Sequence, residues 1–197
     1  MSSLEPAVLE KPALRAMAMG RRDSLPPAER ARASLAIADR AGALLGELRP
    51  RVVAGYLPIR SEVDVRPLLE AARAAGAIIA LPAILDSTTI RFRRYGPEGR
   101  LVLNRFGTLA PDEDAPEVVP DLVILPMVGF DRTGARLGHG KGFYDRLLGN
   151  WPGRRPALLG IAFAAQEVPA IPREAHDLRL DWAVTERETL DFRGNSA

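Results

Sequence analysis

The sequence predicts an α/β fold in which helices cover both faces of a mostly parallel sheet, with a small antiparallel insertion. Short apolar runs, which are typical of buried strands, alternate along the chain with longer stretches of helical periodicity. The strand, helix and strand expected between residues 51 and 81 also follow one another at a spacing that favours a parallel crossover. A chain of 197 residues is long enough for one domain with one core.

The first quarter of the chain predicts two helices. Residues 1–10 are expected to be disordered, and residues 11–197 to form a single domain. A first helix is expected from Pro12 to Arg22, and a longer one from Pro26 to Leu48, where apolar residues form a broad stripe. Ser24 is expected to be the N-cap of the second helix, because a serine side chain accepts a hydrogen bond from an unpaired N–H of the first turn.

The next segment predicts a strand, a helix and a second strand. The apolar run Arg51–Leu57 is expected to be a buried strand. A helix is expected from Val65 to Ala75, and Gly76 is expected to end it, since glycine reaches a left-handed conformation at little cost. The second strand is expected over Ala77–Leu81, with Pro82 as its end.

The middle of the chain predicts the antiparallel insertion. Residues Thr89–Tyr95 alternate apolar and charged side chains, which indicates a half-exposed strand, and Arg100–Asn104 is its expected antiparallel partner. The acidic, proline-rich segment Ala110–Pro120 is expected to be an irregular connector.

The last third predicts three buried strands around one helix. The strands are expected at Leu122–Leu125, at Ala157–Phe163 and, as the final strand, at Leu180–Thr185. The helix is expected from Phe143 to about Asn150.

Composition excludes several classes of function. The chain has no cysteine, which excludes disulfides and thiolate metal sites. No apolar run is long enough to span a bilayer and no secretory signal is evident, so no membrane partner and a cytoplasmic location are expected. The formal net charge is +2, and the arginines are spread along the chain without interleaved aromatics, so no nucleic-acid partner is expected. All but two of the 27 basic residues are arginine, the exceptions being Lys11 and Lys141.

A loop of alternating glycines precedes the predicted helix at Phe143. Gly138, Gly140 and Gly142 would let the backbone approach a ligand closely, and successive N–H groups could then surround an anion such as phosphate. The basic side chains of the same stretch are Arg136, His139 and Lys141. From this loop alone, a flexible glycine loop with a solvated lysine is an equally good interpretation.

Two known phosphate-binding motifs do not fit this loop. A P-loop requires a glycine where Ala135 stands and Ser or Thr where Gly142 follows the lysine. The dinucleotide fingerprint requires a glycine or alanine at the position of Phe143.

The stretch does resemble the signature of the 5-formyltetrahydrofolate cyclo-ligase, or methenyltetrahydrofolate synthetase, family. That signature reads Pro-x-x-x-Phe-Asp-x-x-Gly-x-Arg-Leu-Gly-x-Gly-x-Gly-[Tyr/Phe]-Tyr-Asp. It is matched here by Pro126, Phe130, Asp131, Gly134, Arg136, Leu137, Gly138, Gly140, Gly142, Phe143, Tyr144 and Asp145. The segments Tyr56–Glu62 and Gly160–Thr185 also resemble the family's pattern.

The resemblance implies a Rossmann-like three-layer sandwich and a particular reaction. In the presence of Mg²⁺, ATP would drive the cyclisation of 5-formyltetrahydrofolate to 5,10-methenyltetrahydrofolate, with release of ADP and phosphate. The implied partners are these two small molecules, with the protein a monomer or weak homodimer. The alternatives are another α/β enzyme acting on phosphorylated ligands, such as a sugar-phosphate isomerase or a CoA-transferase relative, and a non-catalytic folate- or nucleotide-binding protein.

The resemblance also implies roles for individual residues. The implied ATP-binding residues are Lys11, Arg15, Arg136, Leu137, Gly138, His139, Gly140, Lys141, Gly142, Phe143 and Tyr144, with Lys141 and Arg136 catalytic. The implied folate-binding residues are Leu57, Glu62, His139, Gly140, Lys141, Gly142, Phe143 and Tyr144. The implied magnesium ligands are Asp145 and Asp181.

The residue pattern by itself offers simpler interpretations for some of these positions. Lys11 and Arg15 are four residues apart on one helical face, and such a pair is commonly solvated. Glu62 alone reads as a surface carboxylate. Asp145, in the first turn of a helix, would also interact favourably with the helix dipole.

Overall fold

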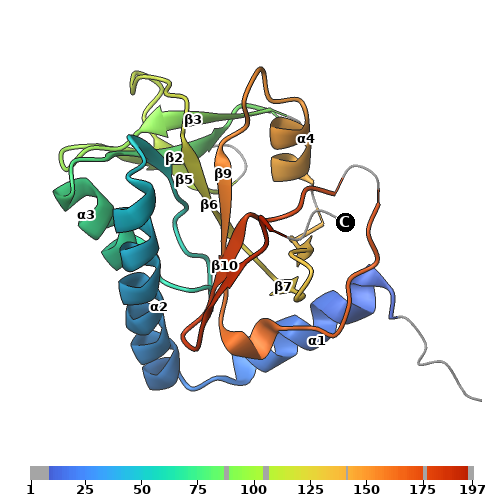
Figure 1. Cartoon of the computed structure of the whole chain (residues 1–197). Coiled ribbons are helices and arrows are strands. Elements are labelled where there is room, and N and C mark those ends of the chain that lie inside the picture. The colour runs from blue at the N-terminus through green and yellow to red at the C-terminus, as the bar shows by residue number, and fades with distance from the viewer. Residues whose placement is uncertain (1–8, 87–88, 104–106, 141, 175–176, 195–197) are drawn as a thin grey trace, which may run out of the picture.

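A seven-stranded sheet forms the centre of the protein (Figure 1). The computed structural model describes residues 9–86, 89–103, 107–140, 142–174 and 177–194. The strands of the sheet, in spatial order, are β11 (Thr189–Asp191), β10 (Trp182–Val184), β9 (Ala157–Ile161), β6 (Leu122–Pro126), β1 (Val52–Ala54), β2 (Ile78–Ile84) and β3 (Ile90–Arg94). The five inner strands are parallel, and the edge strands β3 and β11 are antiparallel to their neighbours. The predicted α/β fold with a mostly parallel sheet is therefore confirmed.

The order of the parallel strands contains a switch point between β1 and β6. From β1 the chain first goes outward to β2, then returns to the other side of β1 and builds β6, β9 and β10 in succession. The connections after β1 and β6 therefore leave in opposite directions. In open parallel sheets, ligands bind in the crevice that this divergence creates at the carboxyl ends of the strands.

Helices cover both faces of the sheet and its carboxyl edge. Helices α2 (Pro27–Leu48) and α3 (Arg66–Ala74) lie on one face, and α4 (Phe143–Gly149) lies on the other (Figure 1). Helix α1 (Lys11–Ser24) runs across the carboxyl edge beside the short helix η1 (Ala164–Gln166). The sheet is thus the middle layer of three, as predicted.

Helix α1 has a small core of its own, apart from the two faces of the sheet. Its buried residues Leu14 and Ala18 pack against Val128, Leu137 and Val168, which come from the segments that follow β6 and β9. This packing fixes α1 against the segments that leave the carboxyl ends of β6 and β9.

The predicted helices are present, and one predicted cap is wrong. Ser24 ends α1 and donates its hydroxyl to the carbonyl of Arg21, while the N-cap of α2 is Pro26. Gly76, with φ of +93°, follows α3 as predicted. Residues 1–10 were predicted to be disordered, and positions 1–8 of this segment lie outside the described residues. Glu10, from the same segment, is the N-cap of α1.

Pro82 does not end the second strand, contrary to the prediction. It lies inside β2 and pairs with Phe92 of β3. Strand β1 pairs only with residues Ile78 to Ala80 of β2, so Pro82 lies beyond the end of β1. The missing N–H of the proline therefore costs no hydrogen bond to β1.

The predicted antiparallel insertion exists, but its pairing was predicted wrongly. Strand β3 pairs with β2 at the edge of the main sheet. The segment after residue 100 instead forms β4 (Leu101–Leu103), which pairs with β5 (Leu109–Pro111). Strand β5 thus occupies the beginning of the segment predicted to be irregular, and residues 104–106 lie outside the described residues.

Short strands escaped prediction at two places. The two-residue strands β7 (Gly129–Phe130) and β8 (Arg136–Leu137) form a hairpin after β6. Strand β11 follows β10, so the strand predicted at Leu180–Thr185 is not the final one. None of the helices in the described ranges is long and apolar enough to cross a membrane.

Candidate active site

The loop that follows β6 is built on a buried aspartate. The carboxylate of Asp131 is 2% exposed and accepts hydrogen bonds from the backbone N–H groups of Thr133 and Ala135. Its second oxygen accepts the N–H of Ile171, 2.9 Å away, from the segment after β9. Gly134 completes the turn with φ of +86°. Asp131 therefore fixes the position of the β7–β8 hairpin, and the glycine loop follows directly after β8.

Two of the three alternating glycines need to be glycine for backbone reasons. Gly140 has φ of +88° and Gly142 has φ of +61°, a region that other L-residues rarely adopt. Gly138 is outside that region, and a Cβ there would meet no atom within 4 Å. The loop therefore combines a fixed left-handed path with open space beside Gly138. Lys141 lies outside the described residues.

The two predicted residues of helix α1 make different contacts, and of these the contact of Arg15 reaches the glycine loop. Arg15 donates from Nε to the carbonyl of Gly138, 2.9 Å away. Lys11, one turn earlier, donates to Glu174 Oε1 at 2.8 Å and to Asp177 Oδ2 at 2.7 Å. Burial lowers the pKa of Lys11, but the hydrogen bonds and charges of the two carboxylates outweigh it, so that its pKa is raised.

The loop after β1 meets the glycine loop through Glu62. Glu62 Oε1 lies 2.9 Å from His139 Nε2, and Oε2 accepts the N–H of Ile59, also at 2.9 Å. The Glu62 side chain is only 6% exposed, whereas His139 is 50% exposed. The predicted folate residue and the predicted ATP loop are therefore in direct contact, with the carboxylate buried beneath the imidazole.

Two tyrosines lie in the field of the same carboxylate. Burial raises the pKa of Tyr144 and of Tyr56, and the negative charge of Glu62 raises both further. The phenol of Tyr56 donates to the carbonyl of Val63, 3.1 Å away. Both phenols therefore stay protonated at neutral pH, so they can donate hydrogen bonds but cannot act as bases.

A shielded ion pair joins the hairpin to the first turn of α4. Arg136 Nη1 and Nη2 lie 3.0 and 2.9 Å from Asp145 Oδ1, and the Arg136 side chain is 6% exposed. Arg136 thereby brings a fixed positive charge to the glycine loop. Asp145 offers a carboxylate at the same place, which is the kind of hard oxygen ligand that Mg²⁺ prefers.

Asp181 is placed differently from Asp145. It precedes β10 at the amino end of that strand, where its carboxylate accepts both Arg155 Nη groups, at 2.7 and 2.8 Å, and the N–H of Leu158. Within the described ranges, no group of three or more His, Cys, Asp and Glu side chains is arranged to hold a metal ion. The structure thus shows no contact that joins the two predicted magnesium ligands.

The remaining predicted residues contribute in less direct ways. Leu137 is 1% exposed and packs against α1, so only its backbone is available to a ligand. Leu57 is half-buried against the core beneath α2 and α3. The guanidinium of Arg146 lies over the ring of Phe143, with 5.4 Å between the guanidinium carbon and the ring centroid.

Comparisons with known proteins identify the family to which this sequence is similar. A sequence profile of the 5-formyltetrahydrofolate cyclo-ligase family matches residues 7–186. The Escherichia coli K12 5-formyltetrahydrofolate cyclo-ligase is 36% identical over 146 residues, which cover 71% of this chain and 80% of the relative. The Haemophilus influenzae 5-formyltetrahydrofolate cyclo-ligase is 31% identical over 143 residues, covering 70% and 76%.

Solved structures show the same fold. The Aquifex aeolicus 5,10-methenyltetrahydrofolate synthetase superimposes with a TM-score of 0.81 at 31% identity, covering 95% of each chain. A 5,10-methenyltetrahydrofolate synthetase from Mycoplasma pneumoniae gives a TM-score of 0.73 at 25% identity and covers 90% of this chain and 99% of the other.

Proposed function

This chain belongs to the 5-formyltetrahydrofolate cyclo-ligase family, and we propose on this premise that it closes 5-formyltetrahydrofolate to 5,10-methenyltetrahydrofolate with ATP. One observation carries the proposal. Arg15 of α1 holds Gly138, and His139 of the same loop touches Glu62. Three segments from distant parts of the sequence therefore meet at the switch point of the sheet, where two substrates have to react with each other.

The nucleotide side of the proposed site is the glycine loop with its basic neighbours. Arg15 and Arg136 are guanidinium groups already fixed by hydrogen bonds, and such groups match phosphate oxygens well. The left-handed path at Gly140 and Gly142 brings the backbone close to a ligand. Lys11 and Lys141 are the other two basic residues proposed to neutralise the phosphate charge of ATP. The role of Lys141 rests on the resemblance alone.

The folate side of the proposed site is centred on Glu62. Its buried carboxylate is a strong acceptor for the N–H groups of a pterin ring, and its hydrogen bond to Ile59 holds it in place. The neutral phenol of Tyr144 lies within the electrostatic influence of Glu62 and is a hydrogen-bond donor. Because His139 occupies Glu62 Oε1 in this structure, the imidazole has to yield this oxygen when folate binds.

The proposed reaction requires no nucleophile from the protein. The formyl oxygen attacks the γ-phosphorus, the bond to ADP breaks, and N5 donates its lone pair to give an iminium phosphate. N10 then attacks the formyl carbon and loses its proton to solvent, and phosphate leaves with the electron pair of the C–O bond. Positioning and charge neutralisation dominate such a transfer, and a chain without cysteine can supply both.

Magnesium belongs to this proposal as an ion carried by ATP. Mg²⁺ commonly binds through one or two carboxylates together with substrate phosphates, where it neutralises phosphate charge. Asp145 fits this role, being held by Arg136 beside the glycine loop. Asp181 stays a prediction from the resemblance, and a metal there would compete with Arg155 for its oxygens.

The decisive assay mixes the protein with Mg-ATP and 5-formyltetrahydrofolate and follows the absorbance of methenyltetrahydrofolate. We expect product only when ATP is present, with one ADP released per ring closed. Turnover of a phosphorylated substrate without ATP would support an isomerase or transferase instead. Binding of either ligand without folate-dependent ADP release would support a non-catalytic binding protein. The cytoplasmic location and the monomeric or weakly dimeric state stay predictions, and gel filtration tests the second.

A further inference from the structure

The turn that carries Glu62 is held in place by few contacts of its own. Residues Ile59 and Arg60 are exposed, and Arg60 has φ of +56°, which is uncommon for a residue with a side chain. Within the turn, Glu62 N–H donates to the carbonyl of Ile59 at 3.2 Å, and the Ile59 N–H donates back to the Glu62 carboxylate. These bonds define the shape of the turn, and its position relative to the glycine loop depends on further contacts, one of which joins Glu62 to His139.

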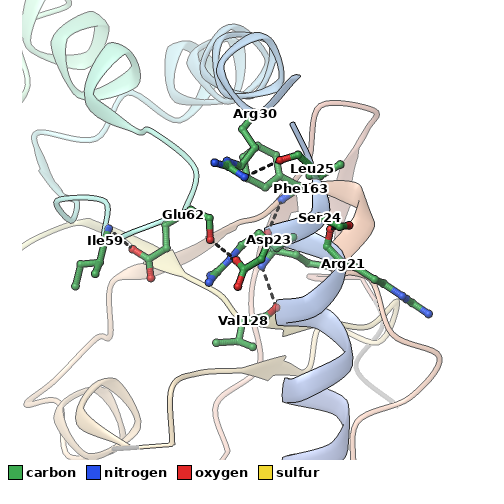
Figure 2. A network of polar contacts seen from close by, with 12 residues as sticks. Arg21, Asp23, Ser24, Leu25, Arg30, Ile59, Glu62, Val128 and Phe163 are labelled. Carbon is green, nitrogen blue, oxygen red and sulfur yellow. Dashed lines mark hydrogen bonds and ion pairs between the residues drawn. The ribbon is translucent and has the colours of Figure 1, made fainter. Parts of the chain in front are cut away.

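The end of helix α1 makes another of these contacts. The hydroxyl of Ser61 donates a short hydrogen bond to Asp23 Oδ1 at the end of α1. The same oxygen accepts Arg22 Nε at 3.2 Å. Figure 2 shows Asp23 beside Glu62, between α1 and the turn that carries Ile59. Ser61, the neighbour of Glu62 in the chain, is therefore hydrogen-bonded to a helix that is distant in sequence.

Arg22 holds the Asp23 carboxylate that accepts this hydrogen bond from Ser61. Its side chain is 2% exposed, and it is the largest fully buried side chain of the described residues. Its Nη1 has no hydrogen-bond partner in the described part of the chain, and its Nε forms an ion pair with Asp23. A buried guanidinium is costly without a counter-charge, which holds Asp23 in one place. The hydrogen bond from Ser61, together with Arg22, lowers the pKa of Asp23, so the carboxylate is ionised at neutral pH.

Helix α1 therefore contacts both substrate loops. Arg15 holds the glycine loop, and Arg22 and Asp23 lie about two helical turns further along. We propose that Asp23 and Ser61, backed by Arg22, are positioning residues that set the location of Glu62 for folate. This inference rests on the proposed function, and it concerns residues that touch neither substrate.

The test is a set of variants of the full chain, measured by the kinetics of ring closure. Wild-type activity is measured first, because its absence would refute the proposed function and not this inference. In Ser61→Ala we expect the KM for 5-formyltetrahydrofolate to rise about tenfold or more, which is the lower end of what the loss of a hydrogen bond to a charged group costs. The KM for ATP should stay at its wild-type value, and Ser61→Thr should restore the folate KM.

A matched control lies beside Asp23. Ser24→Ala removes a hydroxyl that donates to the carbonyl of Arg21, its one hydrogen bond within the described ranges, at the same end of α1. It should leave both KM values unchanged. The double variant of Ser61→Ala with Asp23→Ala should be no worse for folate than the more affected single variant, because both remove the same hydrogen bond.

Three outcomes would overturn the inference. One is an unchanged folate KM in Ser61→Ala. Another is an equal rise in both KM values together with a lower melting temperature, which would indicate a general structural role. The third is a fully additive double variant. Should Asp23→Ala fail to fold, the comparison of Ser61→Ala with Ser61→Thr decides the question alone.

Discussion

Replacing Glu62 by glutamine is the sharpest test of how this protein holds folate. The substitution keeps the shape of the side chain and one oxygen that can accept the N–H of Ile59. It removes the negative charge that faces His139 from a position only 6% exposed. A glutamine also presents an N–H₂ group, which cannot accept the N–H donors expected on a pterin.

The expected loss follows from the chemistry of this contact. Hydrogen bonds to a charged group contribute about 1.5 to 3 kcal/mol, which corresponds to roughly a 10- to 150-fold rise in the KM for 5-formyltetrahydrofolate. In the proposed binding mode Glu62 accepts N–H groups of the pterin ring and not the reacting formyl group, so the effect should be on KM more than on kcat. The KM for ATP should stay the same. The free energy of unfolding should change by less than about 1 kcal/mol, because the lost partner His139 is half exposed.

The assay is steady-state ring closure with each substrate varied in turn, together with urea denaturation. Asp121→Asn is the matched control, since that carboxylate also accepts backbone N–H groups, from Arg51 and Val52, at the amino end of the sheet. It should leave both KM values unchanged. If the folate KM of Glu62→Gln stays within about threefold of the wild-type value, the change in binding free energy is below about 1 kcal/mol, and Glu62 is not part of the folate site. Equal effects on the KM values for ATP and for folate would refute the assignment of Glu62 to the folate side of the site and not to the nucleotide side.

Three further predictions concern the glycine loop, α1 and the buried phenol. Gly140→Ala should destabilise the fold by about 1 to 2 kcal/mol in urea denaturation, because φ there is +88°. Gly138→Ala should leave stability unchanged, and any rise in its KM for ATP measures how closely the nucleotide approaches the backbone. Arg15→Ala should raise the KM for ATP about tenfold or more through the loss of a charged donor, with the folate KM unchanged as the internal control. Tyr56→Phe should cost about 1 kcal/mol at pH 7, since it loses the hydrogen bond to Val63. Because burial raises the pKa of Tyr56, its contribution to wild-type stability is complete below pH 10 and is lost above it, by up to about 1.4 kcal/mol per pH unit. The urea stability of Tyr56→Phe should therefore decline less steeply above pH 10, and equal slopes for the two proteins would contradict this account.

The sequence was sufficient for the elements that have a strong periodic pattern. The stripe of α2 and the apolar runs of β6 and β9 predicted those elements, because each buries a continuous face. The two-residue strands β7 and β8 are too short to show any period. The partner of β3 was missed for a different reason: alternation shows that a strand has one exposed side, but not which strand lies beside it.

The candidate site was predictable only where a contiguous motif carries it. Arg136, Gly138 and Asp145 lie within one signature, so their proximity follows from their spacing. The bond between Ser61 and Asp23 joins residues 38 positions apart, and neither residue shows a pattern that predicts it. A polar contact between two loops depends on the final arrangement of the elements, which the residues of one segment do not determine.

The topology explains why the site needs a helix that lies outside the sheet layers. The switch point between β1 and β6 separates the loops that follow these strands, and in open parallel sheets ligands bind at such a point. The same divergence leaves the two loops without a common strand to align them. Helix α1 spans the edge of the sheet and holds one loop through Arg15 and the other through Asp23. The geometry in which ATP and folate would meet is thus set by an element that belongs to neither βα unit. A substitution on the buried side of α1 should therefore change the affinity for both substrates without touching either of them.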